Sequence, residues 1–154
     1  MTSSARSLVT LLAFGFAVLC AQPALGADNL KLNAHLDYSS DSIDGPLITG
    51  DNMQAGEVPG KPNYIIIYGE GCFNSKRQAR RTVHLYERYR DRVHFVVIDL
   101  DQPQTSDQQQ LVHKYYGGSI PDVIVVDGQE RPLYAQAGEV SEEDLSKIFD
   151  RALQ

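Results

Sequence analysis

Cysteine is scarce in this sequence of 154 residues, and long apolar runs are absent. The two cysteines are Cys20 and Cys72, and no apolar stretch reaches the roughly 20 residues that a membrane-spanning helix needs. Basic residues are also in the minority, since 14 Lys and Arg stand against 20 Asp and Glu, a formal net charge of −6. This balance argues against a nucleic-acid partner and against a polybasic lipid-binding segment, because both depend on a basic surface.

Residues 1–26 are predicted to be a signal peptide in front of one globular domain. Arg6 supplies a positive start, residues 8–19 form an apolar run, and Ala24-Leu25-Gly26 resembles a signal-peptidase site. We predict cleavage after Gly26 or Ala27. The protein is therefore expected to be exported, periplasmic or secreted, with no membrane association after cleavage.

Cleavage would leave Cys72 as the only cysteine of the exported chain. A lipid anchor on Cys20 is the less favoured alternative, because lipoprotein signals place a small residue before the cysteine and Leu19 stands there. Among charged residues the leader holds only Arg6, so 13 basic residues remain against 20 acidic ones, a formal charge of −7. In an oxidising compartment a lone cysteine is a reactive thiol, half of an intermolecular bridge or an inert buried residue, and the sequence leaves these open.

The remaining cysteine follows a predicted central strand. Residues 64–68 are an unbroken run of β-branched and aromatic side chains between Pro62 and Gly69, typical of a strand buried on both faces. From Ser75 to about residue 91, apolar residues recur at helical spacing, so Cys72 is predicted where the strand turns into a helix. The first N–H groups of a helix are unpaired and carry the positive end of its dipole, which favours a thiolate there.

These motifs together resemble thioredoxin-fold proteins. Lys61-Pro62, Cys72-Phe73-Asn74-Ser75-Lys76 and Ser119-Ile120-Pro121 match that family's motif order over residues 61–154, with serine at the second active-site cysteine. The resemblance implies an α/β fold: a three-layer thioredoxin-like sandwich with a mixed sheet, a C-terminal antiparallel hairpin and a closing helix. It also implies a cis Pro121 that faces Cys72 and borders a groove for an extended partner chain.

The sequence after the cysteine predicts the elements of such a fold in order. Residues 93–100 are a second buried strand. A helix capped by Thr105 or Ser106 runs to about residue 116, and residues 123–126 are a third strand.

The C-terminal part is predicted to be a hairpin and a helix. Asp127-Gly128 is a two-residue hairpin signal, residues 131–135 are the antiparallel return, and Pro132 marks that strand as an edge. Ser141 opens the last helix. Its core stripe is Leu145, Ile148, Phe149, Ala152 and Leu153.

Residues 27–60 are predicted to be a polar, poorly ordered N-terminal extension. They are rich in turn residues and show no sustained helical or strand period. Residues 30–38 alternate apolar and polar side chains and supply at most one edge strand. The helix that thioredoxin-like domains usually carry before the central strand is missing or very short.

Thiol-disulfide exchange without intramolecular resolution is the predicted function. A thiolate at Cys72 attacks a disulfide sulfur and forms a mixed disulfide. Ser75 stands where a second thiol would release the product, and its hydroxyl cannot form a disulfide, although it can donate a hydrogen bond to the thiolate. Release then needs an outside thiol, so the expected partners are protein thiols or disulfides, or a low-molecular-weight thiol.

The predicted site has two groups of residues. The catalytic group is Cys72, Ser75 and Pro121, and the substrate-binding group is Phe73, Ser119 and Ile120. A catalytically inactive binding module, which docks a partner without covalent chemistry near Phe73 and Pro121, is the alternative.

The charged and substituted positions around the thiol modify this prediction. Lys76 and Arg77 would favour the thiolate and Glu70 would oppose it, whereas most other basic residues of the helix are expected to form a solvated face. Ile66 replaces the buried aspartate that reducing thioredoxins usually carry. Gly71 replaces the aromatic residue that usually precedes the cysteine.

No metal or cofactor is predicted. Asp99-x-Asp101 lacks the glycine and distal glutamate of a calcium loop and reads as a turn. The four histidines, His35, His84, His94 and His113, stand at no recurring ligand spacing. Cys72-Phe73-Asn74-Ser75 differs from the Cys-Gly-Phe-Ser of monothiol glutaredoxins, and no hydrolase signature surrounds the thiol.

Overall fold

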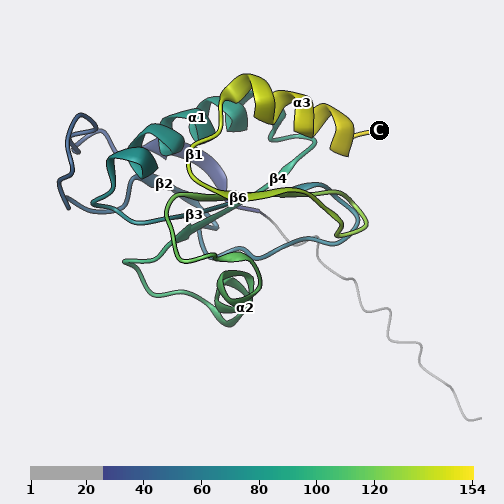
Figure 1. Ribbon diagram of the computed structural model, residues 1–154, viewed down its shortest axis with the longest axis horizontal. Coiled ribbons are helices and arrows are strands. Elements are labelled where there is room, and N and C mark those ends of the chain that lie inside the picture. The colour runs from purple at the N-terminus through teal and green to yellow at the C-terminus, as the bar shows by residue number, and fades with distance from the viewer. Residues whose placement is uncertain (1–25) are drawn as a thin grey trace, which may run out of the picture.

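The computed structural model describes residues 26–154, which form six strands and three helices (Figure 1). Of the predicted signal peptide, only Gly26 lies among these residues. The elements are β1 (Asp28–Leu32), β2 (Ile48–Asp51), β3 (Asn63–Tyr68), α1 (Phe73–Tyr89), β4 (His94–Asp99), α2 (Ser106–Tyr115), β5 (Asp122–Val126), β6 (Pro132–Ala137) and α3 (Glu142–Ala152). In this part of the chain, no helix has the length and apolar character that crossing a membrane requires.

A mixed four-stranded sheet in the order β4-β3-β5-β6 forms the middle layer. The strand β3 pairs in parallel with β4 and antiparallel with β5, and β5 pairs antiparallel with β6. Helices α1 and α3 cover one face of the sheet and α2 covers the other (Figure 1). The predicted three-layer α/β architecture is confirmed.

The apolar run of β3 fills both sides of the sheet. Tyr64, Ile66 and Tyr68 belong to the core under α1 and α3, whereas Ile65 and Ile67 belong to the core under α2. All six residues of the strand are buried. A strand covered on both faces needs apolar side chains at every position, which is why the run does not alternate.

The connections follow the predicted signals with one correction. Thr105 and Ser141 are the N-caps of α2 and α3, as predicted. The loop between β5 and β6 spans residues 127–131 and is longer than the predicted two-residue turn. The cause is the Asp127 carboxylate, whose Oδ1 accepts the N–H groups of Gln129 at 2.9 Å and Arg131 at 3.0 Å and so builds a wider turn.

The prediction of poor order for residues 27–60 is wrong. Strands β1 and β2 pair antiparallel in a separate two-stranded sheet. Their buried side chains, with those of Ala27 and Leu47, join the core under α1. The strand expected at 30–38 is β1, which is shifted toward the N-terminus and does not join the main sheet. No helix occurs in residues 26–62, as the sequence indicates.

Hydrogen bonds to the rest of the domain and within the segment itself supply the order of residues 27–60. The N–H of Asn29 donates to the Tyr86 hydroxyl of α1 at 2.8 Å, and the Ala27 N–H donates to the carbonyl of Phe95 in β4 at 3.0 Å. The Tyr38 hydroxyl donates to the Leu47 carbonyl at 2.6 Å. The segment is ordered with few apolar residues because these polar groups find hydrogen-bond partners on the domain or within the segment.

Candidate functional site

Cys72 lies at the junction that the sequence predicts. It is the N-cap of α1, with extended backbone angles, and its side chain is half-buried. Its carbonyl accepts the first helical N–H, that of Lys76, at 3.0 Å. Helix α1 starts at Phe73, two residues before the start at Ser75 that the helical spacing indicates, so the thiol stands at the positive end of the helix dipole.

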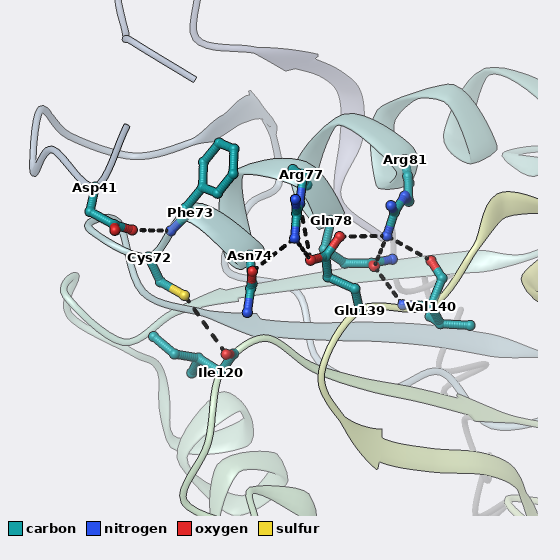
Figure 2. A network of polar contacts seen from close by, with 10 residues as sticks. All are labelled: Asp41, Cys72, Phe73, Asn74, Arg77, Gln78, Arg81, Ile120, Glu139 and Val140. Carbon is teal, nitrogen blue, oxygen red and sulfur yellow. Dashed lines mark hydrogen bonds and ion pairs between the residues drawn. The ribbon is translucent and has the colours of Figure 1, made fainter. Parts of the chain in front are cut away.

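The thiol faces the bend that precedes β5. The Ile120-Pro121 peptide bond is cis, as the resemblance implies. The Cys72 Sγ donates to the Ile120 carbonyl at a distance of 3.8 Å (Figure 2). Gly69 permits this approach, because a Cβ at that position would lie 2.7 Å from Cδ1 of Ile120. The fold therefore brings together Cys72, Ile120 and Pro121.

The other three predicted site residues do not converge on the sulfur. Ser75 is buried, and its Oγ has no hydrogen-bond partner among residues 26–154, so the expected bond to the Cys72 thiol is not formed. The sulfur turns instead toward the Ile120 carbonyl. The Phe73 ring points away from Ile120 (Figure 2) and stacks on the Arg77 guanidinium at 4.7 Å. Ser119 is exposed beside the bend.

Lys76 does not lie on a solvated face, and its charge is directed away from the thiol. Its side chain is fully buried, with 0% exposure. The ammonium donates to the carbonyls of Asp37 at 2.6 Å and Ser40 at 2.8 Å, and to the Ser42 hydroxyl at 2.9 Å. Lys76 thus fixes residues 37–44, here called the loop 37–44, against the start of α1. The sequence gives no local indication of this contact.

The loop 37–44 also places a carboxylate at the N-terminal end of α1. The Phe73 N–H donates to Asp41 Oδ1 at 2.6 Å (Figure 2). Helix α1 has no acidic residue in its own first turn, so Asp41 is the anion that meets its dipole there. A negative charge beside Cys72 opposes the formation of a second one.

The predicted cation Arg77 is already paired. Its Nε donates to Glu139 Oε1 at 3.0 Å, and Arg81 contacts the other oxygen of that carboxylate at 2.9 Å (Figure 2). The Lys76 ammonium is bound by the loop 37–44 and the Arg77 guanidinium by Glu139. Both cations predicted to act on the sulfur therefore already have other partners. Of the features expected to act on the thiol, the start of α1 is therefore the one that reaches it.

The turn after β4 contributes a second group of carboxylates, which contacts Glu70, two residues before the cysteine. Asp101 Oδ2 accepts the N–H of Glu70 at 2.8 Å, and Asp99 Oδ1 accepts the N–H of Asp101 at 3.0 Å. Gln102 donates to Glu70 Oε1 at 2.8 Å. Asp99 and Asp101 are turn formers, as predicted. Within residues 26–154, no three side chains of His, Cys, Asp or Glu gather as metal ligands would.

Asp99→Asn is expected to stabilise the fold at neutral pH. Burial, with the nearby Glu70 carboxylate, raises the pKa of Asp99 to about 6. The folded protein therefore binds a proton at the Asp99 carboxylate more tightly than the unfolded chain does. The ionised Asp99 carboxylate therefore destabilises the folded state. This loss of stability grows as the pH rises from about 4 to about 6 and stays constant above that range. We expect the variant to gain about 1–2 kcal/mol at pH 7 and little at pH 4, allowing for the partial exposure of Asp99.

Urea unfolding at pH 4, pH 5 and pH 7 measures this difference. Asp127→Asn is the matched control with the opposite sign, because the Arg131 guanidinium and backbone N–H groups lower the pKa of Asp127. The control should be less stable than the wild type by the same amount at pH 5 and pH 7. A gain for Asp99→Asn that does not change with pH would contradict the assignment.

Comparisons with known proteins identify the fold. No family model matches the sequence, and no curated protein matches it either. Among solved structures, a malarial protein is 20% identical, with 61% of this chain and 99% of that chain covered and a TM-score of 0.51. Thioredoxin-2, a component of malaria parasite protein secretion machinery, is 20% identical, with 59% and 82% covered and a TM-score of 0.50.

A third likeness is to an exposed lipoprotein thioredoxin of Streptococcus pneumoniae. It is 11% identical, with 60% of this chain and 85% of that chain covered and a TM-score of 0.50. At these identities the likenesses show the fold alone. The chain has a thioredoxin-like fold, with a mixed sheet between three helices.

Proposed function

We propose that this thioredoxin-like protein is exported and forms mixed disulfides through Cys72 by exchange with the disulfides of proteins or of low-molecular-weight thiols. The observation that supports this proposal most directly is the position of the half-buried Cys72 sulfur. It lies at the N-cap of α1 and is directed at the Ile120 carbonyl beside cis Pro121. In that position the helix end favours the thiolate, and the bend offers backbone for an extended partner.

The proposed reaction is a balanced exchange. The Cys72 thiolate attacks one sulfur of a partner disulfide, the partner's S–S bond breaks, and a new S–S bond joins Cys72 to that sulfur. The other sulfur leaves as a thiolate and takes up a proton. No net oxidation occurs, because one disulfide is exchanged for another.

The covalent complex is not resolved from within the chain. Ser75 carries a hydroxyl where a resolving thiol would stand, and Ile66, buried in β3, provides no base. A low-molecular-weight thiol or a second cysteine on the partner must release the product. The proposal therefore describes capture and slow shuffling rather than efficient reduction.

Reaction with a small aromatic disulfide tests the proposal. The chain without residues 1–26 should release one equivalent of aromatic thiolate and gain the mass of one aromatic thiol, whereas Cys72→Ser should do neither. At pH 7 the folded protein should react about tenfold faster than the same protein unfolded in urea, because only the fold provides the helix terminus.

A folded protein that reacts no faster than the unfolded chain would overturn the proposal. Partner binding that survives in Cys72→Ala would favour the non-covalent binding module. Export is part of the proposal, so the intact mass of protein from its native source should start at Ala27 or Asp28. A mass that begins with a lipid-modified Cys20 would contradict this.

A further inference from the structure

The loop 37–44 is a fixed part of the surface around Cys72. The buried Lys76 ammonium binds it at three oxygens, and Asp41 binds the N–H of Phe73, the residue after the cysteine. Both anchors lie in the first turn of α1. Any chain that approaches Cys72 from this side therefore meets the loop.

One side chain of this loop is both exposed and close to the cysteine. Ile43 has 76% of its surface exposed, and it is the large apolar residue that stands out as exposed among residues 26–154. It lies over Gly71, because a Cβ on Gly71 would be only 2.6 Å from Ile43 Cγ1. Because Gly71 has no side chain, there is room for Ile43 beside Cys72. The apolar surface next to the cysteine is thus provided by the loop 37–44 and not by the residue before the cysteine.

Two exposed carboxylates form an acidic rim near the sulfur. Asp41 Oδ1 binds the N–H of Phe73, directly after the cysteine, and Asp101 Oδ2 binds the N–H of Glu70, two residues before it. Of the nearby cations, Arg77 is paired with Glu139, and the Lys76 ammonium is buried beneath the loop and is not exposed on the rim. A partner that fits this rim carries positive charge.

We infer that the loop 37–44 forms one wall of the docking surface at Cys72 and selects extended polypeptides with an apolar side chain beside their cysteine and basic residues next to it. This inference rests on the proposed function. The apolar side chain of the partner packs on Ile43, which removes two exposed apolar surfaces from water. The basic residues face Asp41 and Asp101.

Peptide capture tests the inference. Two peptides, Lys-Leu-Cys-Leu-Lys and Lys-Ser-Cys-Ser-Lys, each carry their cysteine as a mixed disulfide with an aromatic thiol, and the rate of their transfer to Cys72 is measured by mass. The wild type should capture the leucine peptide about tenfold faster, the discrimination that one apolar contact provides. In Ile43→Ser the two rates should become equal within about twofold. Val112→Ser, on α2 at the opposite face of the sheet, is the control and should keep the wild-type preference.

The outcomes separate the two proposals. If the wild type reacts with neither peptide nor a small aromatic disulfide, the proposed function fails. If it reacts with both peptides equally, or if Ile43→Ser keeps the preference, the function stands and the loop wall is overturned. A version of the leucine peptide with glutamate in place of lysine should be captured more slowly, and equal capture would contradict the charge part of the inference.

Discussion

Ser75→Cys is expected to turn Cys72 from a thiol that captures a partner into one that also releases it. Ser75 lies one helical turn after Cys72, where i and i+3 side chains are about 5–6 Å apart. Its Oγ is buried without a partner, so a sulfur can replace it without loss of a hydrogen bond. The new thiol attacks the mixed disulfide at Cys72, the partner leaves as a thiolate, and an internal disulfide remains.

The expected effect is large because the second thiol acts within the chain. Its effective concentration is in the millimolar range or above, so release should be about 100-fold faster than with an outside thiol at about 10 μM. The measurement is the reduction of a protein disulfide over many turnovers, with dithiothreitol regenerating the variant. The oxidised variant should also lose both free thiols as a monomer.

Two controls make this result specific. Ser75→Ala fills the same buried place without a thiol and should behave as the wild type does. Ser146→Cys adds a second thiol far from Cys72, at another buried hydroxyl that has no hydrogen-bond partner among the described residues. Ser146 lies on α3, and α3 contacts α1 near His84, which is about 18 Å along the helix from Cys72. A Ser75→Cys protein that forms its internal disulfide but turns over no faster than Ser146→Cys would show that something other than the missing thiol limits release.

The sheet and the position of the thiol could be predicted because their causes are local in the sequence. Residues 64–68 of β3 are all aliphatic or aromatic since both faces of the strand are covered, and the Thr105 and Ser141 caps bind N–H groups three residues away. The cis bond at Pro121 followed from the family resemblance. Periodicity alone could not have provided it.

The surroundings of the thiol could not be predicted, because their contacts join residues more than thirty positions apart. Lys76 and Asp37 are separated by 39 residues, and Phe73 and Asp41 by 32. A polar segment without a period gives no sign that a buried ammonium will hold it. Gly71 was the one available clue, since the loss of a side chain before the cysteine suggests that another part of the chain occupies the space.

Lys76→Met is expected to be strongly destabilising. Methionine keeps an unbranched apolar side chain of similar length in the buried channel, so the change removes mainly the ammonium. Three hydrogen bonds of 2.6–2.9 Å are lost, and two carbonyl oxygens of the loop 37–44 are left without a donor. Hydrogen bonds to charged groups contribute about 1.5–3 kcal/mol each, and release of the loop to water recovers part of this, so we expect a loss of about 2–4 kcal/mol.

Urea unfolding at pH 7 measures the loss, and hydrogen exchange of the loop amides locates it. Lys147→Met is the matched control, because Lys147 is an exposed lysine on α3 whose ammonium pairs with Glu143 at 2.7 Å. Such surface pairs contribute little, so the control should stay within about 0.5 kcal/mol of the wild type. In Lys76→Met the amides of the loop should exchange much faster while those of β3 remain protected. If both lysine variants unfold alike and the loop stays protected, Asp41 and the neighbouring backbone hold the loop without Lys76, and the buried ammonium is not its anchor.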